Sequence, residues 1–100
     1  MTNRAGQEEY IVTLKGYSLP EKGGNESRRD FGNRCLEKLK LDAKEPLELV
    51  NALGGQLFTK NAWLWLSGSF RVMLTASGAE SLRLHPSVEL VERPKPIVLE

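Results

Sequence analysis

The chain has 100 residues, enough for one small two-layer domain and too few for a protease domain beside it. Its formal charge of +1 gives no net attraction to nucleic acid or anionic lipid, so a partner must be recognised by shape and local pattern. Cys35 is the only cysteine, which excludes an internal disulfide and argues against a disulfide-stapled secreted scaffold.

We expect no signal peptide and no membrane span in this sequence. Residues 1–10 are polar and lack the apolar core of a signal peptide. No run approaches the roughly 18 apolar residues that a membrane helix needs. We therefore expect no membrane contact and a cytoplasmic location, or a secreted one if a leader has been removed.

The chain is expected to form one domain over residues 9–92, between a disordered start at 1–8 and an extended tail at 93–100. Apolar and other residues alternate from Glu9 to Lys15, which predicts a strand with one apolar face. Residues 16–26 are rich in Gly, Pro, Lys, Asn and Glu, a composition that predicts a loop.

A first helix is predicted after this loop. Ser27 can cap its start, and an acid follows three residues later. Phe31, Cys35 and Leu39 then recur every four residues, which predicts a buried stripe on a helix that ends near Leu41.

A second helix is predicted directly afterwards. Pro46 fits its first turn, and Val50 and Leu53 lie on one side of it. The pair Gly54-Gly55 then provides a left-handed stop.

Residues 56–74 are expected to form the central hairpin, whose turn decides which residues face the core. A two-residue turn before Ser69 places both Trp63 and Trp65 on the core side, whereas a three-residue loop around Gly68 turns both outward. The residue opposite Phe70 would be Trp65 in the first case and Leu66 in the second.

A turn at Lys60-Asn61 is a third possibility, and it would make the following strand unusually long. After the hairpin, Thr75 or Ser77 can cap a short helix. The residues His85-Pro86-Ser87 end that helix, and a last strand follows over residues 88–92.

The elements read β-α-(α)-β-β-α-β. This order predicts an α+β, ferredoxin-like fold, with a four-stranded antiparallel sheet, helices on one face and an extra helix between the first two strands. The other face is open and carries Arg71 and Met73, together with either Trp63 and Trp65 or Leu64 and Leu66. Such a face is offered to a partner, or else it is covered by a small satellite core or by the N-terminal segment.

Several positions carry a resemblance to a known family: Glu9–Lys15, Gly54-Gly55, Leu74-Thr75, Leu82, Pro86-Ser87-Val88 and Val91-Glu92. In order and spacing they are similar to the propeptides of subtilisin-type serine proteases, a family that also contains free-standing protease inhibitors. The similarity covers roughly half of the chain, by the residues that match between Glu9 and Glu92. Family members usually have one helix between the first two strands, so this chain looks enlarged there.

The resemblance implies a way of binding. The open face would pack on surface helices of the protease, and the extended tail would lie in the substrate cleft, with Ile97 or Leu99 in an apolar subsite. Acidic residues at the end of the last strand would cap protease helices, as Glu92 could, whereas Arg93 and Pro94 depart from the acidic pattern. The residues expected to bind the partner are Trp63, Trp65, Arg71, Met73, Glu89, Glu92, Pro96, Ile97, Val98 and Leu99.

Other functions have less in the sequence to support them. His85 is the sole histidine and is better placed to cap a turn than to act as a base, and no Cys or His pair has metal-ligand spacing. We therefore expect no enzyme, metal or cofactor. Single-stranded RNA binding would need more than the one aromatic and one cation of residues 67–73. The remaining alternative is a ferredoxin-like domain that binds a small ligand or forms a weak homodimer.

Overall fold

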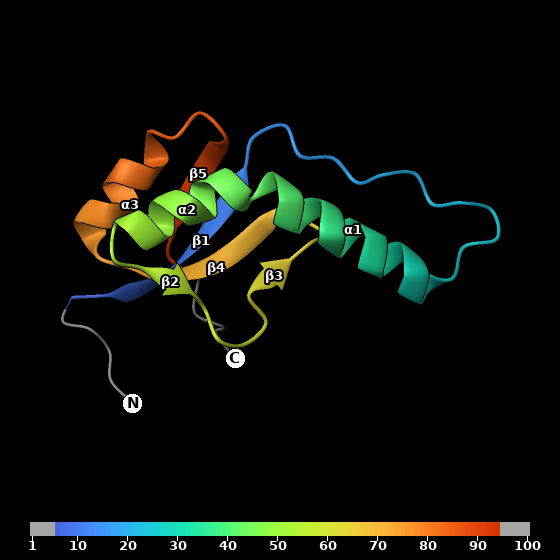
Figure 1. The fold of residues 1–100 in the computed structure, drawn as a ribbon, viewed down its shortest axis with the longest axis horizontal. Helices are drawn as coiled ribbons and strands as arrows, with labels where there is room; N and C mark the ends of the chain where they lie inside the picture. The colour runs from blue at the N-terminus through green and yellow to red at the C-terminus, as the bar shows by residue number, and fades with distance from the viewer. Residues whose placement is uncertain (1–5, 95–100) are drawn as a thin grey trace, which may run out of the picture.

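The structure is a computed structural model and describes residues 6–94. Five strands and three helices lie in this part of the chain (Figure 1). Their bounds are β1 Glu8–Leu14, α1 Arg28–Asp42, α2 Lys44–Ala52, β2 Gln56–Leu57, β3 Trp63–Leu64, β4 Ser69–Leu74, α3 Ala76–Arg83 and β5 Val88–Glu92.

All of these strands join one antiparallel sheet. The strand order is β2-β4-β1-β5, and β3 pairs with β4 on the same side as β2. An open antiparallel sheet in a small α+β domain is therefore confirmed. The predicted number of strands is wrong, because β2 and β3 together occupy the place of a single predicted strand.

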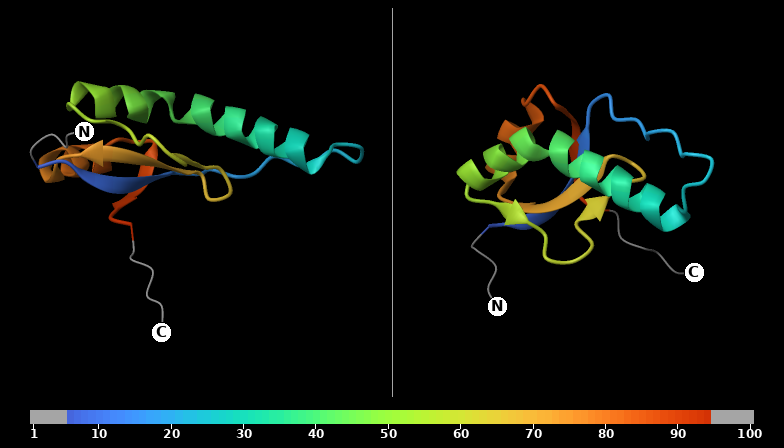
Figure 2. Two further views of the ribbon diagram at one scale, coloured as in Figure 1. Left: turned by 90° about the horizontal axis from the view of Figure 1, so that it is seen from below. Right: turned by 45° about the vertical axis from the view of Figure 1, so that its right-hand side comes forward.

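The helices form a layer on one side of the sheet. In the left view of Figure 2, α1 and α2 run one after the other along that side. Ser27 caps α1 by accepting a hydrogen bond from the Asp30 backbone, as its sequence position predicts. Gly54 has a φ of 83°, which confirms the left-handed stop after α2.

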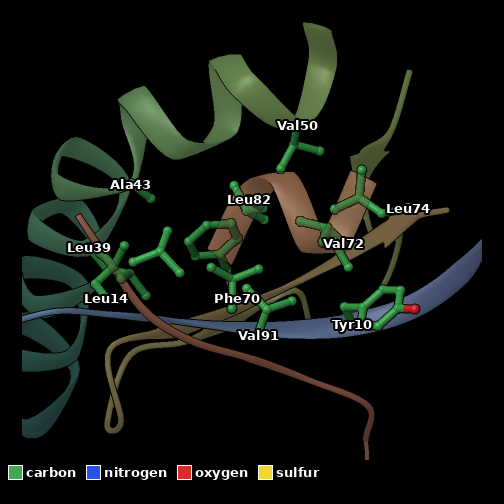
Figure 3. Packing of buried hydrophobic residues seen from close by; sticks show 13 residues of the cluster. Tyr10, Leu14, Leu39, Ala43, Val50, Phe70, Val72, Leu74, Leu82 and Val91 are labelled. Carbon is green, nitrogen blue, oxygen red and sulfur yellow. The ribbon is translucent and has the colours of Figure 1, made fainter. Parts of the chain in front are cut away.

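The core lies between this helix layer and the sheet (Figure 3). Cys35 and Leu39 of the predicted stripe are fully buried on α1, and Val50 is fully buried on α2. Leu82 of α3 joins the same cluster, so α3 covers the same side of the sheet. The strands contribute Tyr10, Val12, Leu14, Phe70, Val72, Leu74, Val88 and Val91.

The hairpin register differs from both predicted registers. Trp63 lies opposite Phe70 and Leu64 opposite Ser69, so four residues connect β3 to β4. The resulting faces still match the two-residue alternative, because Phe70 is buried in the core and Trp63 shares its side of the sheet.

The predicted second strand is interrupted in its middle. The Phe58 N–H donates to the Arg71 carbonyl, while the Arg71 N–H donates to the Ala62 carbonyl. The residues between Phe58 and Ala62 therefore leave the sheet edge and return to it, and Asn61 among them has a φ of 49°. Both β2 and β3 pair with β4 in the same antiparallel direction, so the chain does not turn back between them. The possible turn at Lys60-Asn61 is therefore wrong.

The ordered domain starts earlier than the predicted boundary. Glu8 is already in β1, and the Gln7 side-chain amide donates to the Gly54 carbonyl at 2.7 Å. The remaining residues of the predicted disordered start, 1–5, lie outside the described part of the chain.

Candidate docking face on the open side of the sheet

Among the described residues, no helix covers the second face of the sheet, which we call the open face. On β1 and β4 it is formed by the residues that alternate with the buried ones. Arg71 and Met73 lie on it as predicted, and β1 adds Glu9, Ile11 and Thr13.

At one end of the open face, two small polar residues lie between two leucines. The hydroxyls of Thr13 and Ser69 are hydrogen-bonded at 2.8 Å, and Ser69 is only 3% exposed. Leu64 lies opposite Ser69 on one side, and Leu90 lies opposite Thr13 on the other. Leu90 is 46% exposed, so apolar area is accessible to solvent at this end of the open face.

Arg71 is held by several groups on this face. Its Nε donates to Glu9 Oε2 at 2.5 Å, and its guanidinium lies 4.3 Å from the centre of the Phe58 ring. Its Nη1 also reaches the carbonyls of Lys60 and Asn61 at 3.3 and 3.4 Å. Arg71 therefore fastens the interruption between β2 and β3 to the open face. The orientation of the Arg71 side chain is set by contacts within the domain.

The edge strand β5 contributes the acidic residues. Glu92 lies opposite Ile11, which places its carboxylate on the open face. Glu89 is exposed at an irregularity where Leu14 pairs with Val88 and Thr13 with Leu90. In the left view of Figure 2, the end of β5 lies on the side of the sheet opposite α1 and α2.

The outer edge of β5 is partly covered by an arginine side chain. Arg83 of α3 donates from Nε and Nη2 to the Val91 carbonyl at 3.2 and 2.9 Å. An unpaired carbonyl at a sheet edge is a template for strand addition, so this side chain protects β5 against pairing with another chain.

The two tryptophans do not lie on the open face, which corrects that part of the prediction. The Trp63 ring packs on Phe70 at 5.7 Å between ring centroids, on the helix side. Trp65 packs edge-on against Phe31 of α1 at 6.3 Å, beside Gly32, where a Cβ would lie 3.4 Å from the indole. Both tryptophan rings are thus turned toward the helices.

Pro96, Ile97, Val98 and Leu99 were also expected to bind the partner, and they lie outside the described residues. The sequence reasoning missed Leu90, and it named Leu64 only as an alternative to the tryptophans. The alternation of β5 could have identified Leu90, since Val91 beside it belongs to the core. Leu64 could not be assigned without the hairpin register.

His85 and Cys35, which we did not expect to be catalytic, both lie where they support the fold. His85 Nδ1 accepts a hydrogen bond from the Ser87 backbone at 3.0 Å, so it caps the turn after α3 as predicted. Cys35 is buried on α1. Within residues 6–94, no group of three or more His, Cys, Asp or Glu side chains could hold a metal ion. No helix in that range is long and apolar enough to cross a membrane.

Away from the open face, the loop before α1 is fastened by an exposed clamp. Arg34 donates from Nε and Nη2 to the two carboxylate oxygens of Glu26, and also to the Glu21 carbonyl. The hydrogen bond from Arg34, helped by the Gly23 backbone N–H, lowers the pKa of Glu26 to about 2. The same bond raises the pKa of Arg34. Elsewhere, burial raises the pKa of the Tyr17 hydroxyl.

Comparison of the sequence with models of known protein families and with curated proteins finds no match.

Proposed function

We propose that this chain is a docking domain of the subtilisin-propeptide type. It binds a subtilisin-type serine protease through the open face and the segment after β5, and it inhibits the protease or assists its folding. The observation that carries this proposal is the separation of the two sides of the sheet: the helices cover one side, while Ile11, Met73, Leu64 and Leu90 are left on the other.

The order of the strands supports a ferredoxin-like topology within this proposal. When β2 and β3 are counted as one interrupted strand, the chain follows β-α-α-β-β-α-β, with β1 and β4 at the centre of the sheet. Two helices, α1 and α2, lie between β1 and the interrupted strand, and α2 continues almost directly from α1 and leads into Gly54. The fold alone does not assign a function, so the argument rests on the open face.

The open face has the chemistry that packing on protease helices would use. Leu90 and the half-buried Ile11 and Met73 offer apolar area, and each square ångström removed from water contributes roughly 25 cal/mol. Glu92 lies beside them, and a carboxylate is stabilised next to the positive end of a helix. Glu89 is exposed and available for a second contact of this kind.

The segment after β5 starts on the correct side for this role. In the left view of Figure 2, β5 ends on the side of the sheet opposite α1 and α2, which is the side of the open face. The proposal places Pro96–Leu99 in the protease cleft as an added strand. Pro94 and Pro96 reduce the entropy that ordering the segment after β5 would cost.

The test is an assay of subtilisin activity titrated with the chain, with a form that lacks residues 93–100, and with two leucine variants. Leu90→Arg introduces a charge on the open face, whereas Leu84→Arg changes an exposed leucine at the end of α3 and is the matched control. We expect inhibition by the full chain, weaker inhibition by the shortened form, and at least about a tenfold loss with Leu90→Arg but not with Leu84→Arg.

The proposal fails if neither the full nor the shortened chain slows hydrolysis or improves protease refolding at micromolar concentration. It also fails if both leucine variants behave alike. Sedimentation of the chain alone, over a range of concentrations, tests the competing possibility that two open faces pair in a homodimer.

A further inference from the structure

A second apolar surface lies on the opposite side of the molecule, where α1 meets α2. A groove with a volume of about 390 Å³ runs between these helices and β3. The residues that matter for its chemistry are Lys40, Leu41, Lys44, Leu47, Glu48 and Trp63. None of them belongs to the open face.

The floor of the groove is apolar and accessible. Leu41 is 76% exposed, an unusual position for a leucine beside other apolar groups. Leu47 and Trp63 are partly buried and pack against the core, so they form a fixed floor rather than a mobile patch. A partner that covers Leu41 would remove this apolar area from water without unfolding any part of the domain.

The rim of the groove is positively charged. Lys40 and Lys44 are one helical turn apart, and across Ala43 the hydrogen bonds keep helical spacing, from Ala43 to Leu39 and from Leu47 to Ala43. Within the described chain neither lysine forms an ion pair, although Lys40 Nζ lies 5.8 Å from the centre of the Trp63 ring.

Glu48 is the only carboxylate in the lining, so two lysines face one acid. Charge complementarity therefore favours an anionic partner.

The lining positions repeat with helical spacing along one face of α1 and α2. Such a face accepts the ridge of a second helix, and apolar anchors on a partner helix then meet the floor at matching intervals. We propose that this groove binds an amphipathic acidic helix, with leucine-type side chains over Leu41 and Trp63 and carboxylates beside Lys40 and Lys44. This site is independent of the proposed protease-docking face.

The experiment uses the fluorescence of Trp63, isolated by the variant Trp65→Phe, because the chain has two tryptophans. The probe is an acetylated and amidated helical peptide with leucines at positions i, i+3, i+4 and i+7 and glutamates on both flanks. The matched control peptide carries lysines in place of the glutamates. We expect a saturable change in emission with the glutamate peptide alone, and weaker binding as salt is raised.

Variants assign the binding to the groove. The double variant Lys40→Glu and Lys44→Glu changes two exposed side chains, and we expect it to weaken binding about tenfold. Leu90→Arg on the open face should leave binding unchanged. The proposal is overturned if emission does not saturate, if the lysine peptide binds as well, if charge reversal has no effect in a folded variant, or if Leu90→Arg abolishes binding.

Discussion

Substitutions at two neighbouring residues of β5 test which side of the sheet is exposed to solvent. Val91 points into the core and is 2% exposed, whereas Leu90 points to the open face and is 46% exposed. Each is replaced by alanine in a separate variant. Both substitutions replace an aliphatic residue in the same strand by alanine, so the difference between them mainly reports burial.

The structure sets the size of each effect. Val91→Ala removes two buried carbon atoms, at about 0.8 kcal/mol each, and the closed cavity left behind raises the loss to about 2–3 kcal/mol. Leu90→Ala removes three carbons from a site that is about half exposed and leaves no closed cavity, so we expect about 1 kcal/mol.

Thermal and urea unfolding measure both values. In a domain of this size each kcal/mol lowers Tm by about 4–8 °C, so Val91→Ala should lower it roughly two to three times as far as Leu90→Ala. A loss for Leu90→Ala that equals the loss for Val91→Ala would refute the reasoning. It would mean that the open face is buried in solution, and a dependence of Tm on protein concentration would then identify self-association as the cause.

Three further predictions concern residues outside the core. The folded pKa of Glu26 lies below its ordinary value, so the clamp with Arg34 stabilises the loop above the ordinary pKa, and this contribution is lost as pH falls from 4.5 to about 2. Protection of the loop amides, taken relative to their intrinsic exchange rate at each pH, should fall over this range, and Arg34→Ala should remove this step. Arg83→Ala uncovers the Val91 carbonyl at the edge of β5, so sedimentation should show increased self-association, and an unchanged monomer would contradict the protective role. Arg71→Lys keeps a charge beside the β1 glutamate but loses the stacking on Phe58; we expect a loss of about 1 kcal/mol and faster amide exchange between β2 and β3, and unchanged exchange would contradict its fastening role.

The helices were predictable because their signals act within a few residues. Ser27 bonds to a backbone group three positions later, and Pro46 lies within the first turn of α2. Gly54 adopts the left-handed conformation that ends a helix. None of these effects depends on the rest of the fold, so the chain between residues 27 and 54 shows them directly in its sequence.

The hairpin was not predictable, because distant residues fix its register. The Tyr17 hydroxyl donates to the Trp65 carbonyl across 48 positions of sequence. Its ring also packs so closely on Gly68 that a Cβ there would lie 2.4 Å from it. The alternation from Gln56 to Leu66 is compatible with several pairings, and only these long-range contacts select one.

The interruption between β2 and β3 is also fixed by contacts between residues that are distant in sequence. Arg71 uses its backbone N–H and carbonyl to hold both ends of the interruption, and its side chain reaches carbonyls within it. A single arginine in β4 carries no sequence signal for this role. An uninterrupted second strand was therefore the simplest prediction, and it was wrong.

Because Trp63 and Trp65 do not lie on the open face, a partner would recognise this face through other side chains. Without Trp63 and Trp65, the apolar contacts come from aliphatic side chains around Thr13 and Ser69, whose hydroxyls already satisfy each other. Arg71 is likewise bonded within the domain, so little side-chain freedom is lost when this face is covered. Affinity for a protease would then come from a preformed surface, while selectivity would depend on Glu92, whose carboxylate forms no ion pair with the described residues.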